Sequence, residues 1–119
     1  MIYTSYFGNA KALKERGIEI VSVSRGKPNG FTGRSLDCLA PTWNMLRMSD
    51  DQYDIEYEKI LKRNNPKQIV DFLGNKDVAL CCWEKNIKDC HREKILQWLR
   101  SFGYDVEEFS TEPIQISML

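Results

Sequence analysis

The order of apolar and polar residues along the chain predicts four β-strands. Strands favour β-branched and aromatic side chains, and glycine, proline and asparagine close most of the candidate segments. The predicted strands are residues 2–7, 18–24, 77–83 and 105–109. The third strand contains the run VALCCW, which is apolar without alternation. Such a run predicts a strand that is buried on both faces, as in the middle of a parallel sheet.

Helical spacing of apolar residues predicts helices between these strands. A short helix over the run AKALKERG is closed by Gly17, and Ser49 with two aspartates after it is typical of a helix start. Asn65 and Pro66 begin a further helix that Gly74 ends, since proline suits the first turn and glycine the position after the last. The last predicted helix opens on Cys90-His91-Arg92 and ends at Gly103.

The alternation of strands and helices predicts the fold class. A strand, a helix and a second strand in quick succession favour parallel pairing with a right-handed crossover. We therefore expect a small three-layer α/β fold, with a mostly parallel sheet of about four or five strands flanked by helices. Residues 1–119 should form a single α/β domain. The irregular segment 26–49 is apolar enough to pack down as a lid or flank, and the tail EPIQISML adds either an edge strand or an oligomer contact.

The composition is typical of a soluble domain. Its 42% of apolar and 29% of charged residues are ordinary values, and 17 basic residues balance 17 acidic ones. Nothing global therefore attracts the chain to nucleic acid or to an anionic membrane, so an anion site has to be local. No apolar run of about 18 residues and no signal-peptide pattern occurs. We expect a cytoplasmic protein with no membrane partner and with reduced cysteines.

Chemically active residues follow the predicted strand ends. Parallel sheets bind ligands outside the carboxyl ends of their strands, where loops and helix starts gather. Tyr6 closes the first strand, Ser24 and Arg25 close the second, and Cys82 and Glu84 close the third. The start of the last helix adds Cys90, His91 and Arg92 to the same edge. The sequence thus predicts a single polar site at this edge.

This arrangement favours an anionic ligand. A helix N-terminus presents backbone N–H groups to an anion, and Arg25 and Arg92 are expected to hold it with forked hydrogen bonds. Ser24, Tyr6 and Cys82 complete the predicted ligand-binding set. The sequence therefore predicts binding of a phosphorylated small molecule, a nucleotide or nucleotide derivative above all. The candidates to stack on a base, each of which has a core position as its alternative, are Tyr6, Phe7, Phe31, Trp43 and Trp83.

Two of these motifs resemble a known family. Cys82-Trp83-Glu84, a short loop and Cys90-His91-Arg92 opening a helix resemble the C-x-E and C-H-R signature of the domain of unknown function 488 family. Ser24-Arg25 followed by Lys27-Pro28 is similar to that family's strand-terminal arginine and proline region. The resemblance implies an α/β fold with a pocket built on these motifs. It implies no settled reaction.

Three predicted catalytic residues leave several chemistries open. Glu84, at the end of a buried strand, is expected to pair with an arginine or with His91, or to transfer protons at the ligand together with His91. Cys90 at a helix start, beside an imidazole and a guanidinium, favours a thiolate and so a cysteine-dependent enzyme as an alternative.

Other functions remain as alternatives. A zinc site would draw on Cys82, Glu84, Cys90 and His91, but their spacing is not that of an established zinc motif, and we predict no metal and no cofactor. Interleaved charges disfavour nucleic acid as a partner without excluding it, and the glycine-rich segment 25–35 is the better candidate for contacting a polyphosphate. The oligomeric state stays open, a homodimer included.

Overall fold

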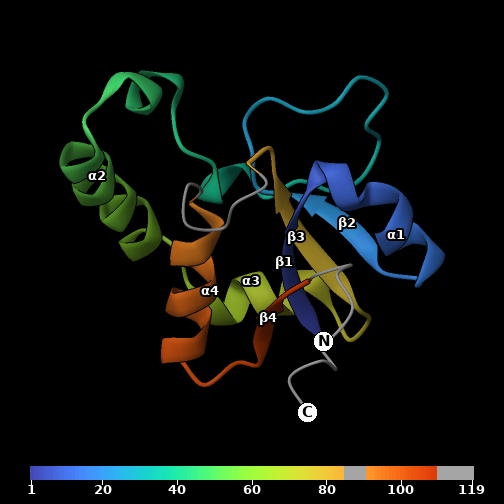
Figure 1. The fold of residues 1–119 in the computed structure, drawn as a ribbon. Helices are drawn as coiled ribbons and strands as arrows, with labels where there is room; N and C mark the ends of the chain where they lie inside the picture. The colour runs from blue at the N-terminus through green and yellow to red at the C-terminus, as the bar shows by residue number, and fades with distance from the viewer. Residues whose placement is uncertain (85–90, 110–119) are drawn as a thin grey trace, which may run out of the picture.

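A four-stranded, all-parallel sheet forms the centre of the described part of the chain. The structure is a computed structural model and describes residues 1–84 and 91–109. In chain order its strands are β1 (Ile2–Tyr6), β2 (Glu19–Ser22), β3 (Val78–Cys82) and β4 (Val106–Glu108). In space they lie in the order β2-β3-β1-β4 (Figure 1). The predicted α/β class and the parallel sheet are confirmed.

The position of β3 explains the apolar run in the sequence. β3 pairs with β2 on one side and with β1 on the other, and each of its five residues is buried. Val78, Leu80 and Cys82 contribute to the core on one face, whereas Ala79 and Cys81 contribute to the core on the other. A strand with both faces covered has no solvent face on which to place polar residues, so the alternation disappears.

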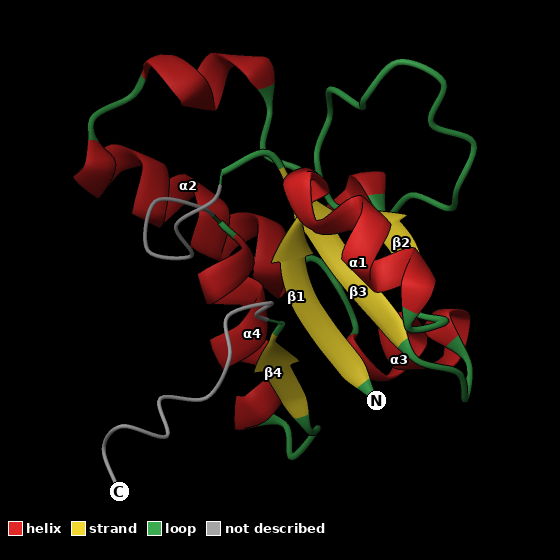
Figure 2. Cartoon of the chain, turned by 45° about the vertical axis from the view of Figure 1, so that its right-hand side comes forward, coloured by secondary structure: helices red, strands yellow, loops and turns green. Residues whose placement is uncertain are grey.

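Helices cover both faces of the sheet. On one face lies α1 (Ala10–Glu15) (Figure 2). Its Leu13 belongs to the same buried apolar cluster as Ala79 and Cys81. The core on the opposite face draws on α2 (Asp50–Lys62), α3 (Pro66–Leu73) and α4 (Arg92–Ser101). The result is the three-layer arrangement that the sequence predicts.

Local capping signals set the starts of α2 and α3. Ser49 Oγ accepts a hydrogen bond of 3.3 Å from Gln52 N, and Asn65 Oδ1 accepts one of 2.9 Å from Lys67 N. Each bond satisfies a backbone N–H group that has no partner within its helix. α4 differs from the prediction, because it begins at Arg92 and His91 occupies the N-cap position. His91 therefore precedes the helix instead of lying within its first turn.

The irregular segment 26–49 packs onto the domain as predicted. It contains two short 3-10 helices, Asp37–Leu39 and Trp43–Arg47, and it buries Leu36, Leu39 and Met45 in the core beside α2. A third 3-10 helix, Phe7–Asn9, links β1 to α1. The predicted role of the C-terminal tail falls on residues outside the described part of the chain. Among the described helices, none has the length and apolar character needed to span a bilayer.

Candidate functional site

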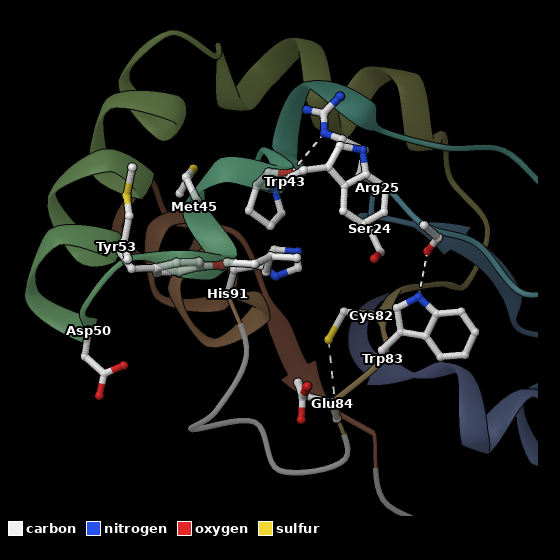
Figure 3. Close-up of a pocket in the computed structure, with 14 residues that line it drawn as sticks. Ser24, Arg25, Trp43, Met45, Asp50, Tyr53, Cys82, Trp83, Glu84 and His91 are labelled. Carbon is white, nitrogen blue, oxygen red and sulfur yellow. Dashed lines mark hydrogen bonds between the residues drawn. The ribbon is translucent and has the colours of Figure 1, made fainter.

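A pocket of about 390 Å³ opens where β2 and β3 end. Residues after both strands line it together with the segment that leads into α2, and Figure 3 shows His91 and Tyr53 across the opening from Trp83. This volume lies within the range of sites that hold one small molecule. The lining residues are Ser24, Arg25, Gly26, Pro41, Trp43, Met45, Leu46, Met48, Asp50, Tyr53, Cys82, Trp83, Glu84 and His91.

Most of the predicted site residues meet at this pocket. Ser24, Arg25, Cys82, Glu84 and His91 all line it, although they come from three separate stretches of sequence. The parallel register brings them together, because the carboxyl ends of β2 and β3 lie side by side. The structure does not place Tyr6 or Arg92 on the lining. The prediction for Cys90 falls outside the described residues.

Arg25 is the cation among the described residues that line the pocket. Its Nε donates to Pro41 O at 3.0 Å and its Nη2 to Ala40 O at 3.3 Å, and these bonds hold the exposed guanidinium against the segment that leads to Trp43. The neighbouring cation, Lys27, does not line the pocket, because its Nζ forms an ion pair of 2.9 Å with Asp37. The fork of Arg25 has further N–H groups that suit an anion.

Two tryptophans line the pocket and stay largely in solvent. Trp43 is 62% exposed and Trp83 is 53% exposed, which is unusual for such large apolar side chains. The Trp83 indole is held by a 2.7 Å hydrogen bond from Nε1 to Gly26 O and by an edge contact with Phe7 at 5.0 Å between ring centroids. A methyl group on Gly26 would lie only 3.1 Å from Trp43. The glycine thus allows the Trp43 ring to approach the loop closely.

His91 contributes a neutral imidazole. Its Nε2 lies 2.7 Å from Val23 O, and a carbonyl oxygen only accepts, so Nε2 carries the hydrogen. Burial lowers the pKa of His91 from its ordinary value to about 4. The hydrogen bond to Val23 raises the pKa by a smaller amount, and the positive charge of Arg92 lowers it slightly further. The Tyr57 ring covers the imidazole edge to face at 5.4 Å. At neutral pH His91 therefore adds no positive charge for an anionic ligand.

Asp50 and Tyr53 come from α2 and were not singled out in the sequence as site residues. Tyr53 stacks on Tyr57 with the ring centroids 6.1 Å apart, and burial, with some help from Asp54, raises the pKa of Tyr53 to about 12. Its hydroxyl group stays protonated and can donate or accept a hydrogen bond. In the sequence, Asp50 is indistinguishable from any acidic residue in a first helical turn, so no local signal marks it as part of a pocket.

Arg92 does not line the pocket and is fully buried. Its Nε and Nη2 bind the two carboxylate oxygens of Glu108 at 3.0 and 2.8 Å. Its Nη1 lies 3.2 Å from Cys82 Sγ and donates to the main-chain oxygen of Glu84. Arg92 is therefore a positioning residue. The bidentate pair with Glu108 fixes its guanidinium, which in turn contacts Cys82 and the main chain of Glu84.

Two predictions need correction here. Arg92, predicted to hold the anion, is fully buried and does not line the pocket. Glu84, predicted to pair with an arginine or with His91 or to transfer protons at the ligand, is exposed on the lining, and none of the ion pairs among the described residues includes it. The carboxylate that Arg92 pairs with is Glu108 on β4, which also accepts a 2.7 Å hydrogen bond from Thr4. Tyr6, which does not line the pocket, packs against Arg92 instead, with its ring centroid 5.9 Å from Arg92 Cζ.

The cysteines also differ from the expectation. Cys82 is disulfide-bonded, so the prediction of reduced cysteines is wrong for this residue. Cys38 and Cys81 are free, the first exposed and the second buried. Burial raises the pKa of both thiols, that of Cys81 to about 12. A buried thiol that keeps its proton is a packing residue and a poor nucleophile.

The free cysteines give a direct test of this arrangement. We expect N-ethylmaleimide to modify Cys38 in the native protein and Cys81 only after unfolding, because Cys38 is exposed and Cys81 has no solvent-accessible surface. Peptide mass spectrometry at neutral pH distinguishes the two sites, and Cys38→Ser is the control for the exposed one. Modification of native Cys81 as fast as Cys38 would contradict the packing of β3.

The described residues contain no group of three or more His, Cys, Asp or Glu side chains arranged to hold a metal ion. Cys90, one of the residues named for the zinc alternative, lies outside the part of the chain that the structure describes. In the part of the lining that the structure describes, one guanidinium, two carboxylates and a neutral imidazole lie among aromatic and thioether side chains.

Fold and site together define a small α/β protein with an aromatic pocket at the carboxyl edge of a parallel sheet. No family model, curated protein or solved structure gives a significant match to the chain. The function therefore has to be argued from the pocket itself.

Proposed function

We propose that the pocket binds a phosphate-bearing small molecule of the nucleotide class, with a nucleoside monophosphate as the best fit. The observation that carries the proposal is the presence of one exposed guanidinium, Arg25, and two exposed indoles, Trp43 and Trp83, on the lining of one cavity. A nucleotide combines the two features that these side chains recognise, an anion and a flat aromatic ring.

Charge limits the number of phosphate groups. Among the described lining residues, Arg25 is the cation, and Asp50 and Glu84 oppose it with two carboxylates. A polyphosphate would meet repulsion from both carboxylates, and of these residues only the Arg25 guanidinium would offset it. One phosphate group at the fork of Arg25, with the Ser24 hydroxyl group nearby, satisfies this balance better.

The remaining lining suits a nucleoside. A base stacks well on the exposed ring of Trp43, and such stacking tolerates any base because every base has a π face. Asp50 and Glu84 accept hydrogen bonds, which matches the donor hydroxyl groups of a ribose or the exocyclic amine of a base. The same carboxylates that disfavour further phosphates therefore recognise the sugar and the base.

Proton transfer at the bound ligand would fall to Glu84 among the predicted catalytic residues that are described. His91 is held neutral by burial, and its Nε2 hydrogen is engaged by Val23 O. Glu84 is exposed on the pocket lining, while its main chain is fixed by Arg92. A carboxylate on a rigid main chain suits a general base in transfer or hydrolysis at the ligand.

Truncation of Trp43 tests the aromatic half of the proposal. We expect Trp43→Ala to weaken the binding of adenosine monophosphate by about tenfold to a hundredfold, the usual cost of losing one stacked base. Its stability should change little, because the side chain is 62% exposed. Phe102→Ala, which removes another exposed aromatic residue away from the pocket, should bind like the wild type. Equal affinities for both variants, measured by isothermal titration calorimetry, would refute the stacking role.

Substitution of Arg25 tests the proposed contact with the phosphate group. We expect Arg25→Met to weaken the binding of adenosine monophosphate by about tenfold or more, because a forked charge-assisted contact to phosphate is lost. Lys27→Met removes the same charge from the same loop but outside the lining, and it should leave the affinity within about twofold. If both variants lost affinity equally, only the overall charge of the loop would matter, and the proposed contact would be wrong.

A further inference from the structure

A second cavity, of about 600 Å³, lies on the α1 side of the sheet, beneath residues 28–33. Its walls are mainly apolar and include Ile18 and Ile20 from the β2 region. Phe7 and Phe31 also line it and make an edge contact with 6.0 Å between ring centroids. Trp83 lines this cavity as well as the first pocket, so one indole forms a wall between the two. The cavity is thus distinct from the proposed nucleotide pocket and adjacent to it.

The loop over this cavity has a defined shape. Phe31 N donates to Pro28 O at 3.1 Å, and Gly30 has a positive φ of 78°, which together make the glycine turn that leads into Phe31. A methyl group on Gly33 would lie 2.8 Å from the Phe31 ring and 2.9 Å from Ile20 O. Residue 33 therefore has to be glycine for the loop to lie this close to the ring and the strand.

Two cations of the glycine-rich segment, Lys27 and Arg34, form ion pairs with carboxylates, which argues against a contact of these two side chains with a polyphosphate. Lys27 pairs with Asp37 at 2.9 Å. Arg34 binds both carboxylate oxygens of Glu19 at 2.7 and 2.8 Å. The segment serves instead as the roof of an apolar cavity, with Pro28 and Phe31 turned to it.

The polar rim of the cavity favours an anion. Lys14 and Glu19 are its charged lining residues, and Glu19 is already bound by Arg34 and, at 3.1 Å, by Lys76. The hydrogen bonds from Arg34 hold the pKa of Glu19 below its ordinary value, so the carboxylate stays ionised within this cluster. Lys14 is exposed, and none of the ion pairs among the described residues includes it. Its charge therefore leaves the rim with a positive excess.

We propose that this second cavity is a separate binding site for a small amphipathic carboxylate, a medium-chain alkyl or arylalkyl acid. The apolar body fills the space between Phe7, Phe31 and Ile18, and the carboxylate pairs with Lys14 at the rim. A body of this kind gains from leaving water, whereas the charged end stays at the exposed edge and loses little hydration. Because Trp83 is shared, the site adjoins the first pocket without overlapping its charged residues.

Octanoate is the probe for this site, and isothermal titration calorimetry of the full chain is the measurement. We expect one-to-one binding with a Kd of ~1 mM or tighter, typical of a ligand with so few atoms in an apolar cavity. Lys14→Glu should weaken binding by about fivefold or more through charge reversal at the rim. Lys11→Glu, the same reversal on an exposed residue of the same helix outside the lining, should bind octanoate like the wild type.

Two further variants locate the ligand. Ala10→Phe and Thr32→Trp each place a large ring in the cavity from opposite sides, and both should abolish octanoate binding. Thr32 is exposed on the loop, so this substitution keeps the fold intact even if the helix variant does not. Arg25→Met should leave octanoate binding unchanged, since Arg25 belongs to the first pocket.

Three results would overturn the proposal. The absence of measurable heat with octanoate at 10 times the expected Kd, ~10 mM, means that the cavity does not take a carboxylate of this class. Binding that survives both Ala10→Phe and Thr32→Trp, or that is lost in Arg25→Met, places the ligand elsewhere. Equal affinity for octanoate and octylamine shows that charge at the rim plays no part.

Discussion

Replacing Glu108 by glutamine is expected to lower the free energy of unfolding by about 3 kcal/mol. The substitution leaves the guanidinium of Arg92 fully buried without its carboxylate, and breaking a buried ion pair from one side usually costs about 3 to 5 kcal/mol. We expect a loss at the lower end of this range, because the Glu108 side chain is 28% exposed and the pair is therefore only partly shielded from water. Chemical denaturation with urea, monitored by circular dichroism, measures the change.

The neighbouring strand residue gives a matched control. Glu107→Gln removes the same charge from an exposed position of β4 and should change the free energy of unfolding by less than about 0.5 kcal/mol. The double variant Arg92→Met with Glu108→Gln should be more stable than the sum of the two single losses implies, because it removes the buried guanidinium together with its half-buried carboxylate. If Glu108→Gln and Glu107→Gln cost the same, the buried pair does not hold the strand ends together.

Acid should destabilise the protein through His91. The folded-state pKa of His91 is about 4, whereas the ordinary value is 6.5. Well above pH 6.5 the imidazole is neutral in both the folded and the unfolded state and contributes no pH dependence. Between pH 6.5 and pH 4 the His91 imidazole is protonated in the unfolded state but stays neutral in the folded state. The free energy of unfolding therefore decreases by about 1.4 kcal/mol for each unit that the pH falls. The total loss approaches about 3 kcal/mol near pH 4.

A non-titrating variant isolates this contribution. His91→Asn keeps an amide that can donate to Val23 O but carries no proton that titrates in this range. Between pH 7 and pH 5 the wild type should lose about 2 kcal/mol more than the variant, measured by urea denaturation at each pH. Parallel pH profiles for the two proteins would show that His91 is not held neutral by burial.

Features set by neighbours in sequence were predictable. The run VALCCW identified β3 because a strand covered on both faces needs apolar side chains on both. Ser49 and Asn65 identified the starts of α2 and α3, because a cap acts on N–H groups only two or three residues away. The meeting of Ser24, Arg25 and Glu84 followed from the rule that parallel strands end at one edge of a sheet.

Features set by contacts between distant segments were not predictable. Nothing near Arg92 in the sequence indicates that its partner is Glu108, since the pair depends on β4 lying beside β1. The same applies to Asp50 and Tyr53, which reach the pocket because the segment 26–49 folds back and carries α2 with it. The second cavity depends on a close approach at Gly33 that the sequence shows only as one glycine among several.

Titration of adenosine monophosphate and adenosine into the wild-type protein tests the central claim most directly. The two ligands share the base and the ribose and differ only in the phosphate group that Arg25 is proposed to hold. We expect the monophosphate to bind one-to-one. Adenosine should bind with an affinity at least about tenfold weaker, because it lacks the charge-assisted contact with Arg25. Equal affinities, or no heat from the monophosphate at ~10 mM, would contradict the assignment of the pocket as a nucleotide site.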